Sequence, residues 1–378
     1  MKRGPAMKRA VGVLLLACAC AARPGGSPAP PAPPSSARVA YEAPPAAPHA
    51  IEISIDERAA REILASLSRP RFEASDPKVL QDLPAVRLAI EDSTRAPEVF
   101  ERDFAAAFDE QVRTSVFNFR TIRQEKEHWQ PLLDAVASRQ AEVARMSSRR
   151  AAALLPSDRA VAARLQVYLT FGIAGLADHL VLSGREGREI MIVDLARALG
   201  ESEAEPLESQ LARLSRLIAG EAYRKAWVVY REGNPAWKAV DPSLGTLDIL
   251  LRSVAEAGPP AVFTVDENFF PLAVWLKEPM RRSIGELNRT ADRLAESQES
   301  LEKRMELTAE IRRGDFSRRL AGPAGAFLTD AIIQAKGVAA LRAALEKGPK
   351  AYFEAYDSVA QGNRDLVPLS HVIREKLK

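Results

Sequence analysis

The feature that most restricts the fold of this chain is a long amphipathic helix whose apolar stripe is interrupted by charge. We expect this helix over residues 206–231, because four apolar residues follow helical spacing: Leu207, Leu211, Leu214 and Ile218. The same spacing continued leads to Glu221 and Lys225, with Gly220 beside them. A glycine inside a helix costs about 1 kcal/mol relative to alanine. A plain amphipathic helix has no reason to carry these residues, so they are the first candidates for a functional site.

The composition is that of a globular protein and gives no sign of a nucleic-acid partner. The 378 residues, 47% of them hydrophobic, are enough for one large domain or two ordinary ones. Lys and Arg outnumber Asp and Glu by 53 to 50, but four of these cations lie in an N-terminal segment that we expect to be removed. The remaining 49 cations and 50 acids nearly balance, so nothing in the charge favours binding to nucleic acid.

Residues 1–20 have the layout of a bacterial secretion signal. A cationic start precedes the apolar run of residues 11–16, which is too short to span a bilayer, and two cysteines follow. The segment LLAC, ending at Cys18, resembles a lipoprotein signal, in which the cysteine is acylated after cleavage. Cys20 is the alternative lipidation site, and an ordinary signal peptide is the alternative to an anchor. We therefore predict a lipoprotein of the bacterial cell envelope, held on a membrane by its N-terminal lipid and facing the periplasm or the exterior.

Residues 21–50 form a different segment, rich in Pro, Ala and Ser. Such a composition buries too little apolar surface to offset the entropy of ordering, and its prolines favour an extended chain. We expect a disordered tether between the lipid anchor and the folded domain; a proline-rich ligand for a recognition domain is the alternative. No cysteine follows Cys20, so the folded part, residues 51–378, must be stabilised by its core without disulfides.

The folded part is predicted to be α+β and predominantly helical, with one small sheet. Residues 51–55 alternate as in a half-buried strand, and Asp56 caps the next helix. A long helical stretch follows from about residue 100 to 146, with phenylalanines at every fourth position. Further strands are predicted at residues 165–171, 179–182 and 189–193, the last two forming a hairpin through SGREGR, before Asp194 caps a short helix. We divide the domain into residues 51–231, with the sheet and the charged helix, and a helical part, residues 232–378.

The charged part of the long helix resembles the metal-binding helix of gluzincin-type zinc peptidases. Their pattern H-E-x-x-H binds zinc through two histidines one turn apart, and its Glu polarises the metal-bound water. Overlaid on GEAYR, the pattern places Gly220 and Arg224 at the histidines and Glu221 at the general base. The third ligand is a Glu on a later helix, and Glu256 in AEAGPPAVF resembles that segment, with an inserted alanine.

The order of elements also resembles that of a bacterial family of zinc-dependent peptidases. In that family the sheet precedes the metal helix, a long helix follows the third ligand, and a glycine-containing helix leads to a closing F-x-x-Y, here Phe353 and Tyr356. The resemblance implies a zincin-like fold, with the small sheet packed on the metal-site helix and a helical C-terminal half.

The chain departs from this family at the residues that bind zinc. Glycine has no ligand atom, and an arginine keeps its proton and repels a dication. The chain has four histidines, none of them one turn from Glu221: His49, His128, His179 and His371. Because a lone carboxylate binds zinc too weakly for an open catalytic site, we expect no metal and no other cofactor. The motif then leaves a vestigial site without a catalytic residue: Gly220, Glu221, Arg224 and Glu256.

Arg224 offers a replacement for the missing metal charge. It lies three residues after Glu221 on the same helix face, and Lys225 lies four residues after it, so both cations can reach this acid. If the fold brings Glu256 to the same point, the guanidinium bridges two carboxylates that once served a metal. The alternative is a helix that faces solvent here, with a surface ion pair worth roughly tenths of a kcal/mol.

Three functions are compatible with the sequence. The first is an anchored, catalytically inactive peptidase-like protein that binds a peptide or an envelope protein, with residues 189–193 as the edge strand that pairs with it. The second is a helical structural lipoprotein unrelated to peptidases, in which the likeness of GEAYR is chance. The third is an active metallopeptidase that binds its metal through residues outside the motif, such as His179 or His128. The sequence points to no particular oligomeric state.

Overall fold

A computed structural model describes residues 49–93, 95–109, 111, 116–172, 178–183, 189–200, 206–265, 274–296, 302, 306 and 320–378. These residues belong to one compact unit, Pro44–Lys378. The predicted signal with both cysteines, the tether up to residue 48 and the turn at residues 184–188 lie outside the described residues. The predicted tether, residues 21–50, overlaps the first strand by one residue, because that strand begins at Ala50.

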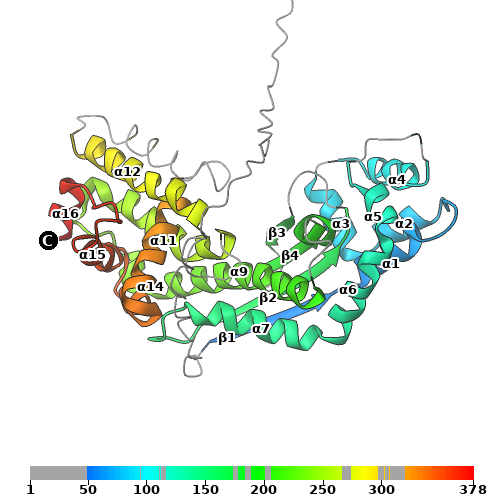
Figure 1. The fold of residues 1–378 in the computed structure, drawn as a ribbon, viewed down its shortest axis with the longest axis horizontal. Coiled ribbons are helices and arrows are strands. Elements are labelled where there is room, and N and C mark those ends of the chain that lie inside the picture. Colours follow the sequence, from blue (N-terminus) through cyan, green and yellow to red (C-terminus); the bar gives the residue numbers. More distant parts are fainter. Residues whose placement is uncertain are drawn as a thin grey trace, which may run out of the picture. The chain divides into compact units, whose positions relative to one another are not determined.

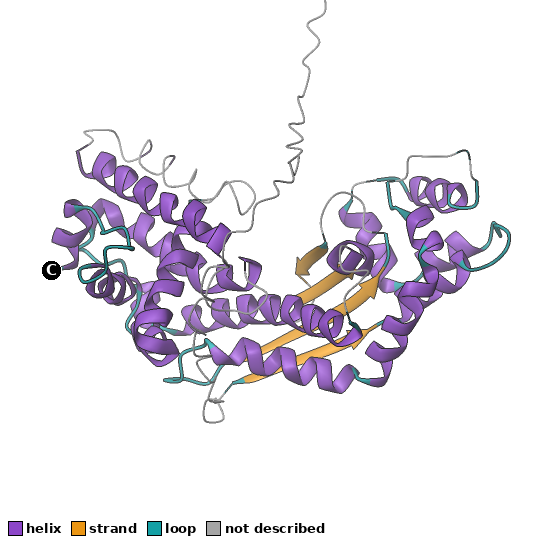
Figure 2. Ribbon diagram, viewed as in Figure 1, coloured by secondary structure: helices purple, strands orange, loops and turns teal. Residues whose placement is uncertain are grey.

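The fold is α+β and mostly helical, as predicted, and the described residues form one mixed sheet of four strands (Figures 1 and 2). Its strands are β1 (Ala50–Asp56), β2 (Ala162–Thr170), β3 (His179–Ser183) and β4 (Glu189–Asp194). They lie in the order β1-β2-β4-β3; β1, β2 and β4 are parallel, and β3 is antiparallel to β4. The predicted pairing of the last two strands is confirmed.

The strand order corrects the prediction that residues 189–193 form an edge. Strand β4 lies between β2 and β3, so the edge strand on this side is β3. The burial of β4 explains the difference: Met191, Ile192 and Val193 are all fully buried, and a strand buried on both faces belongs inside a sheet. Strand β3 is short and its central side chains are only partly buried, as is common at an edge.

The helices between β1 and β2 differ from the prediction in two respects. They are α1 (Arg58–Leu67), α2 (Asp76–Gln81), α3 (Pro84–Asp92), α4 (Pro97–Ala106), α5 (Phe119–Gln124), α6 (Lys126–Ser138) and α7 (Gln140–Ala153). The expected long helix is therefore several helices, broken where Asn118 takes a left-handed backbone with φ of 60° and again at Arg139. Its phenylalanines do form core, since Phe100 and Phe104 are buried. The prediction that Asp56 caps α1 is wrong by one residue, because the N-cap position is Glu57, which makes no side-chain cap hydrogen bond. Asp56 lies just before it, and its carboxylate accepts the N–H of Arg58 at 3.0 Å.

Helix α9 (Leu207–Gly233) is the predicted charged helix, and it packs on the sheet. Together with α7 it covers one face, where both helices lie in front of the strands in Figure 1. The short helix α8 (Leu195–Leu199) precedes it and is capped by Asp194, whose side chain accepts the N–H groups of Ala196 and Arg197, as predicted. On the opposite face of the sheet, Glu52, Ser54 and Arg164 are exposed.

The chain after α9 is helical in its described residues. It forms α10 (Pro235–Lys238), the 3-10 turn η3 (Gly245–Leu247), α11 (Asp248–Val265), α12 (Val274–Glu296), α14 (Ala321–Glu346), α15 (Pro349–Ala360) and α16 (His371–Leu377). Helices α11 and α14 approach closely, because a Cβ at Gly258 would lie 2.7 Å from the carbonyl oxygen of Gly325. Helix α14 is long and apolar enough to cross a membrane, but 56% of its most apolar window is buried inside the protein, as in a core helix.

Candidate functional site

Helix α9 carries its buried stripe past the charged residues, not through them. The buried side chains continue beyond Ile218 as Ala222, Tyr223, Ala226, Trp227 and Tyr230. Glu221, Arg224 and Lys225 are partly buried and lie along the border of this stripe. The prediction that the stripe itself passes through Glu221 and Lys225 is therefore wrong by one position. The three charged side chains lie where the helix borders the sheet.

Strands β3 and β4 present two further polar side chains to this part of α9. In the antiparallel pair, His179 lies opposite Val193 and Glu189 lies opposite Ser183. Because side chains alternate between the faces of a strand, His179 and Glu189 share one face of the sheet. Glu189 is buried on the same strand face as Met191, so an acid stands in an otherwise apolar alternation. Such a buried acid needs a cationic partner.

Six charged side chains from these elements form a connected ion cluster: Asp178, His179, Glu189, Glu221, Arg224 and Lys225. Arg224 is central, because its Nε donates to Glu221 Oε2 at 2.6 Å and its Nη2 donates to Glu189 Oε1. Lys225 Nζ lies 4.0 Å from Glu189 Oε2. His179 Nε2 lies 3.5 Å from Glu221 Oε1, and its Nδ1 is hydrogen-bonded to Asp178 Oδ1 at 2.7 Å. The ion cluster thus ties α9 to both β3 and β4.

The electrostatic balance of the ion cluster favours charged side chains despite their burial. Burial lowers the pKa of His179, but its hydrogen bonds to Asp178 and Glu221 prevail and raise this pKa to about 9. Burial raises the pKa of Glu221, yet His179 and Arg224 prevail and hold it below its usual range. For Arg224 the two acids outweigh burial, and the pKa of the guanidinium rises. With His179 protonated, three cationic side chains face three acidic ones, so the charges of the ion cluster balance.

Glu256 is not part of the ion cluster that Arg224 forms. Its carboxylate pairs with Arg231 Nη1 at 2.7 Å, and its backbone carbonyl accepts the indole N–H of Trp227 at 2.9 Å. The predicted bridge from Arg224 to Glu221 and Glu256 is therefore half right: Glu221 is bound, but the second acid is Glu189. The reason is the register of α11 against α9, which places Glu256 beside the last turns of α9.

Gly220 permits the close approach of α11 to α9. A Cβ at this position would lie 3.0 Å from the Cβ of Phe263, tighter than nearly all such contacts. Tyr223 stacks on the ring of Phe263, with the centroids 5.0 Å apart. The glycine that breaks the predicted stripe is thus explained by helix packing. A larger side chain at residue 220 requires Phe263 to move.

A comparison with known families identifies the relatives of this chain. One family model matches residues 80–365, a range that contains the whole ion cluster and Glu256. The family is described as "Putative zinc dependent peptidase (DUF5700)". This chain belongs to that family. Neither a curated protein nor a solved structure matches it. The membership contradicts one part of the second interpretation, namely that the chain is unrelated to this peptidase family.

The family description implies zinc, and the residues of this site do not fit that ion. A zinc site uses deprotonated nitrogen, sulfur or oxygen ligands that converge on one point. Here Glu221 and Glu189 both direct oxygens at the guanidinium of Arg224, which stays charged at any accessible pH. Within the residues that the structure describes, no group of three or more His, Cys, Asp or Glu side chains is arranged to hold a metal ion. We therefore assign no chemical step to a zinc ion in this member of the family.

The sequence did not predict two residues of the ion cluster, and it predicted a different role for a third. Glu189 and Asp178 were not predicted, and His179 was named only as an alternative metal ligand. The sequence does contain a pattern that indicates Glu189. In a strand, residues 189, 191 and 193 point to the same face, so Glu189 shares the buried face of Met191 and Val193. His128, the other histidine named with His179, lies on α6, where its ring packs edge-on against Trp129.

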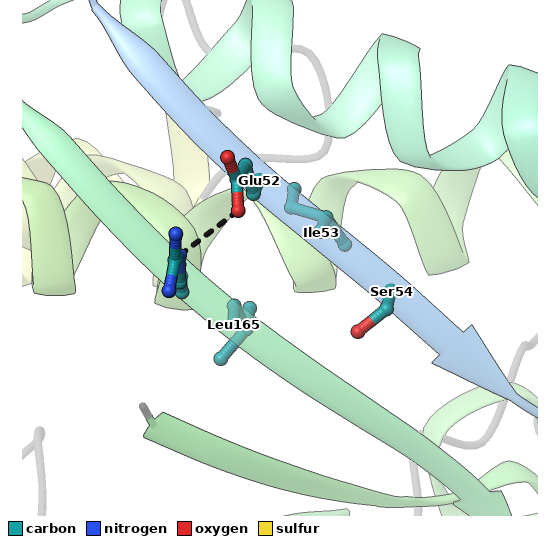
Figure 3. A pocket seen from close by; sticks show the side chains of 5 residues that line it. Glu52, Ile53, Ser54 and Leu165 are labelled. Carbon is teal, nitrogen blue, oxygen red and sulfur yellow. Dashed lines mark hydrogen bonds and ion pairs between the residues drawn. The ribbon is translucent and has the colours of Figure 1, made fainter. Parts of the chain in front are cut away.

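The pocket shown in Figure 3 lies elsewhere, between β1 and β2. It is lined by Glu52, Ile53, Ser54, Arg164 and Leu165. Arg164 Nε donates to Glu52 Oε2 at 2.9 Å, and both side chains are about two-thirds exposed, as in an ordinary surface pair. None of the five residues belongs to the ion cluster, so we do not include this pocket in the candidate site.

Proposed function

We propose that this protein is a lipid-anchored member of the family in the bacterial cell envelope, that it does not hydrolyse peptides, and that it binds an extended peptide or a segment of an envelope protein along β3. The observation that carries the proposal is the position of Arg224 between Glu221 and Glu189. In a gluzincin-like site, Glu221 would need a free carboxylate to accept a proton from water. Here one oxygen of Glu221 accepts a hydrogen bond from Arg224 and the other faces His179. The carboxylate is therefore not free to act as a general base.

The backbone of β3 supports the binding of an extended segment. The N–H of Asp194 donates to the carbonyl of Asp178 at 2.9 Å, so the backbone groups of Asp178 face β4. Because these groups alternate along an antiparallel pair, those of His179, Val181 and Ser183 face away from β4. No other described strand pairs with that side. An added strand can therefore hydrogen-bond there, as in β-strand addition.

The side chains beside this edge determine which contacts a bound segment can make. Leu180 and Leu182 are partly exposed on one face of β3, and they offer apolar contact to alternate side chains of the added strand. On the other face lies His179, next to the ion cluster. Because the charges of the ion cluster balance, we expect main-chain hydrogen bonds and apolar contacts to provide most of the affinity.

Metal analysis together with a hydrolysis assay tests the loss of catalysis. The full chain, purified in detergent, is measured for bound zinc and incubated with an unstructured protein substrate, with and without added Zn²⁺. We expect zinc far below one equivalent and no cleavage in either condition. One equivalent of zinc, with cleavage that a chelator and His179→Ala both abolish, would instead establish the alternative of an active metallopeptidase, which the position of His179 beside Glu221 favours.

Metabolic labelling with a fatty-acid probe tests the membrane anchor. We expect label on the wild-type chain, loss of label in Cys18→Ala, and retention of label in Cys20→Ala. The reverse result would place the lipid on Cys20. Labelling of neither the wild type nor the variants would support an ordinary signal peptide and remove the anchor from the proposal.

A further inference from the structure

Arg224 occupies the meeting point of three elements. Its guanidinium bonds Glu221 of its own helix and Glu189 of β4, and the other oxygen of Glu221 faces His179 of β3 at 3.5 Å. Without this cation, the buried carboxylate of Glu189 and the partly buried carboxylate of Glu221 would face each other without compensation. The arginine therefore both neutralises these acids and joins the sheet to α9.

We infer that the Arg224 guanidinium does the work of a divalent cation in this fold, and that Glu189, Glu221 and His179 form a divalent-cation site once the guanidinium is removed. This deepens the proposed function and rests on it, because it explains how the site stays closed without a metal. The donor set differs from the motif positions at residues 220, 224 and 256, since two of its three members come from the sheet.

The chemistry of the donors supports the inference. Two carboxylates and an imidazole are the ligand types of Zn²⁺ and related divalent ions. A metal-binding histidine usually gives its second ring nitrogen to a carboxylate, which fixes the ring. His179 has this partner already, because its Nδ1 is bound to Asp178 at 2.7 Å while its Nε2 faces Glu221.

The spacing explains why the wild-type residues are not arranged as a metal site. A guanidinium separates the acids by its own width plus two hydrogen bonds, whereas zinc–oxygen bonds are only about 2.0–2.2 Å long. Removing the arginine leaves space, and rotation of the side chains of Glu189 and Glu221 can bring their oxygens together. In the wild type, the fixed positive charge also repels a dication.

The experiment measures Zn²⁺ binding by titration calorimetry and thermal unfolding on full chains stripped with a chelator. We expect Arg224→Ala to bind about one equivalent and to unfold at a higher temperature with Zn²⁺, whereas the wild type shows neither effect. Adding His179→Ala or Glu189→Gln to Arg224→Ala is expected to weaken Zn²⁺ binding at least about tenfold. Arg231→Ala is the matched control, because it removes an arginine of α9 that pairs with Glu256 instead, and it should gain no Zn²⁺ affinity.

A second variant keeps the test valid if Arg224→Ala does not fold. Arg224→Gln retains much of the side-chain length without the charge, and we expect it to bind Zn²⁺ as well. The inference is overturned if folded Arg224→Ala or Arg224→Gln binds Zn²⁺ no better than the wild type, or if the double variants bind as tightly as the single one. If the Arg224 variants bind no Zn²⁺ but the wild type is also free of metal and cleaves nothing, the inference fails and the proposed function still holds. If the wild type binds zinc and hydrolyses peptide, both the inference and the proposed function fail.

Discussion

The two edges of the sheet are attached to the helices by different kinds of interaction. At β1, the N–H of Ala50 faces β2, so the backbone groups of Ile51 face outward. Ser148 of α7 donates to the carbonyl oxygen of Ile51 at 2.9 Å, which uses one of these groups. At β3 the contacts with α9 are ionic, from His179 to Glu221 and, through the neighbouring strand, from Glu189 to Arg224.

The difference separates an edge at which a helix side chain occupies a backbone group from the edge at which we propose that a peptide binds. A neutral hydrogen bond from a packed helix is insensitive to pH and blocks a position that another strand would need. An ionic attachment depends on the charge of each partner, and in the described part of the chain no other strand pairs with the outward backbone groups of β3. Each change below alters one of these attachments or the outward backbone of β3, and together they test whether the two edges differ in this way.

Loss of Arg224 is expected to have the largest effect, because it leaves Glu189 and Glu221 without their shared cation. We expect Arg224→Ala to lower the free energy of unfolding by roughly 2–3 kcal/mol, less than the roughly 3–5 kcal/mol of a fully buried pair, because the Arg224 side chain is 39% exposed. Urea unfolding in the absence of divalent ions measures the change. Arg164→Ala, at the exposed pair with Glu52, is the control and should cost less than about 1 kcal/mol. Equal losses in the two variants would contradict a special role for the ion cluster.

The attachment of β3 is expected to weaken as the pH rises. The pKa of His179 in the folded protein, about 9, lies above the value of about 6.5 for an exposed histidine. Protonation therefore favours the folded state, and its stabilisation is complete below about pH 6.5 and lost as the pH rises through about 9. We expect the stability advantage of the wild type over His179→Gln to shrink by roughly 2–3 kcal/mol over this range. Parallel pH profiles of the two proteins would show that His179 does not stabilise this edge.

A proline in β3 is expected to abolish binding at the open edge with little effect on the fold. The N–H of Val181 faces away from β4, so Val181→Pro removes an outward donor without breaking a bond of the sheet. Selection from a random peptide library on the wild type provides the probe, and we expect Val181→Pro to weaken its binding at least about tenfold, or about 1.4 kcal/mol. Val181→Thr, which keeps the N–H, is the control. Binding that survives in Val181→Pro would place the peptide elsewhere.

The sequence predicts interactions within an element better than those between elements. The strands, α9 and the pairing of Arg224 with Glu221 follow from periodicity and from a three-residue spacing on one helix. The pairing of Arg224 with Glu189 joins residues 35 positions apart in the chain, and the partner of Glu256 depends on how α11 slides along α9. No pattern of neighbouring residues in the sequence predicts the register of α11 against α9. The sequence also contains a partial indication that β4 lies inside the sheet, because a run of apolar residues without alternation, here residues 190–193, is typical of a central strand.

The neutral attachment of β1 is expected to contribute least and to respond to no change of pH. Ser148→Ala removes the hydrogen bond to Ile51 and leaves that carbonyl beside α7, so we expect a loss of about 1 kcal/mol in the free energy of unfolding. Because no titrating group takes part, the loss should be the same at about pH 6 and about pH 9. Unfolding at both values, beside His179→Gln, checks this directly. A loss at β1 that varied with pH as strongly as the one at β3 would mean that the charges of the ion cluster act on the whole sheet and not on one edge.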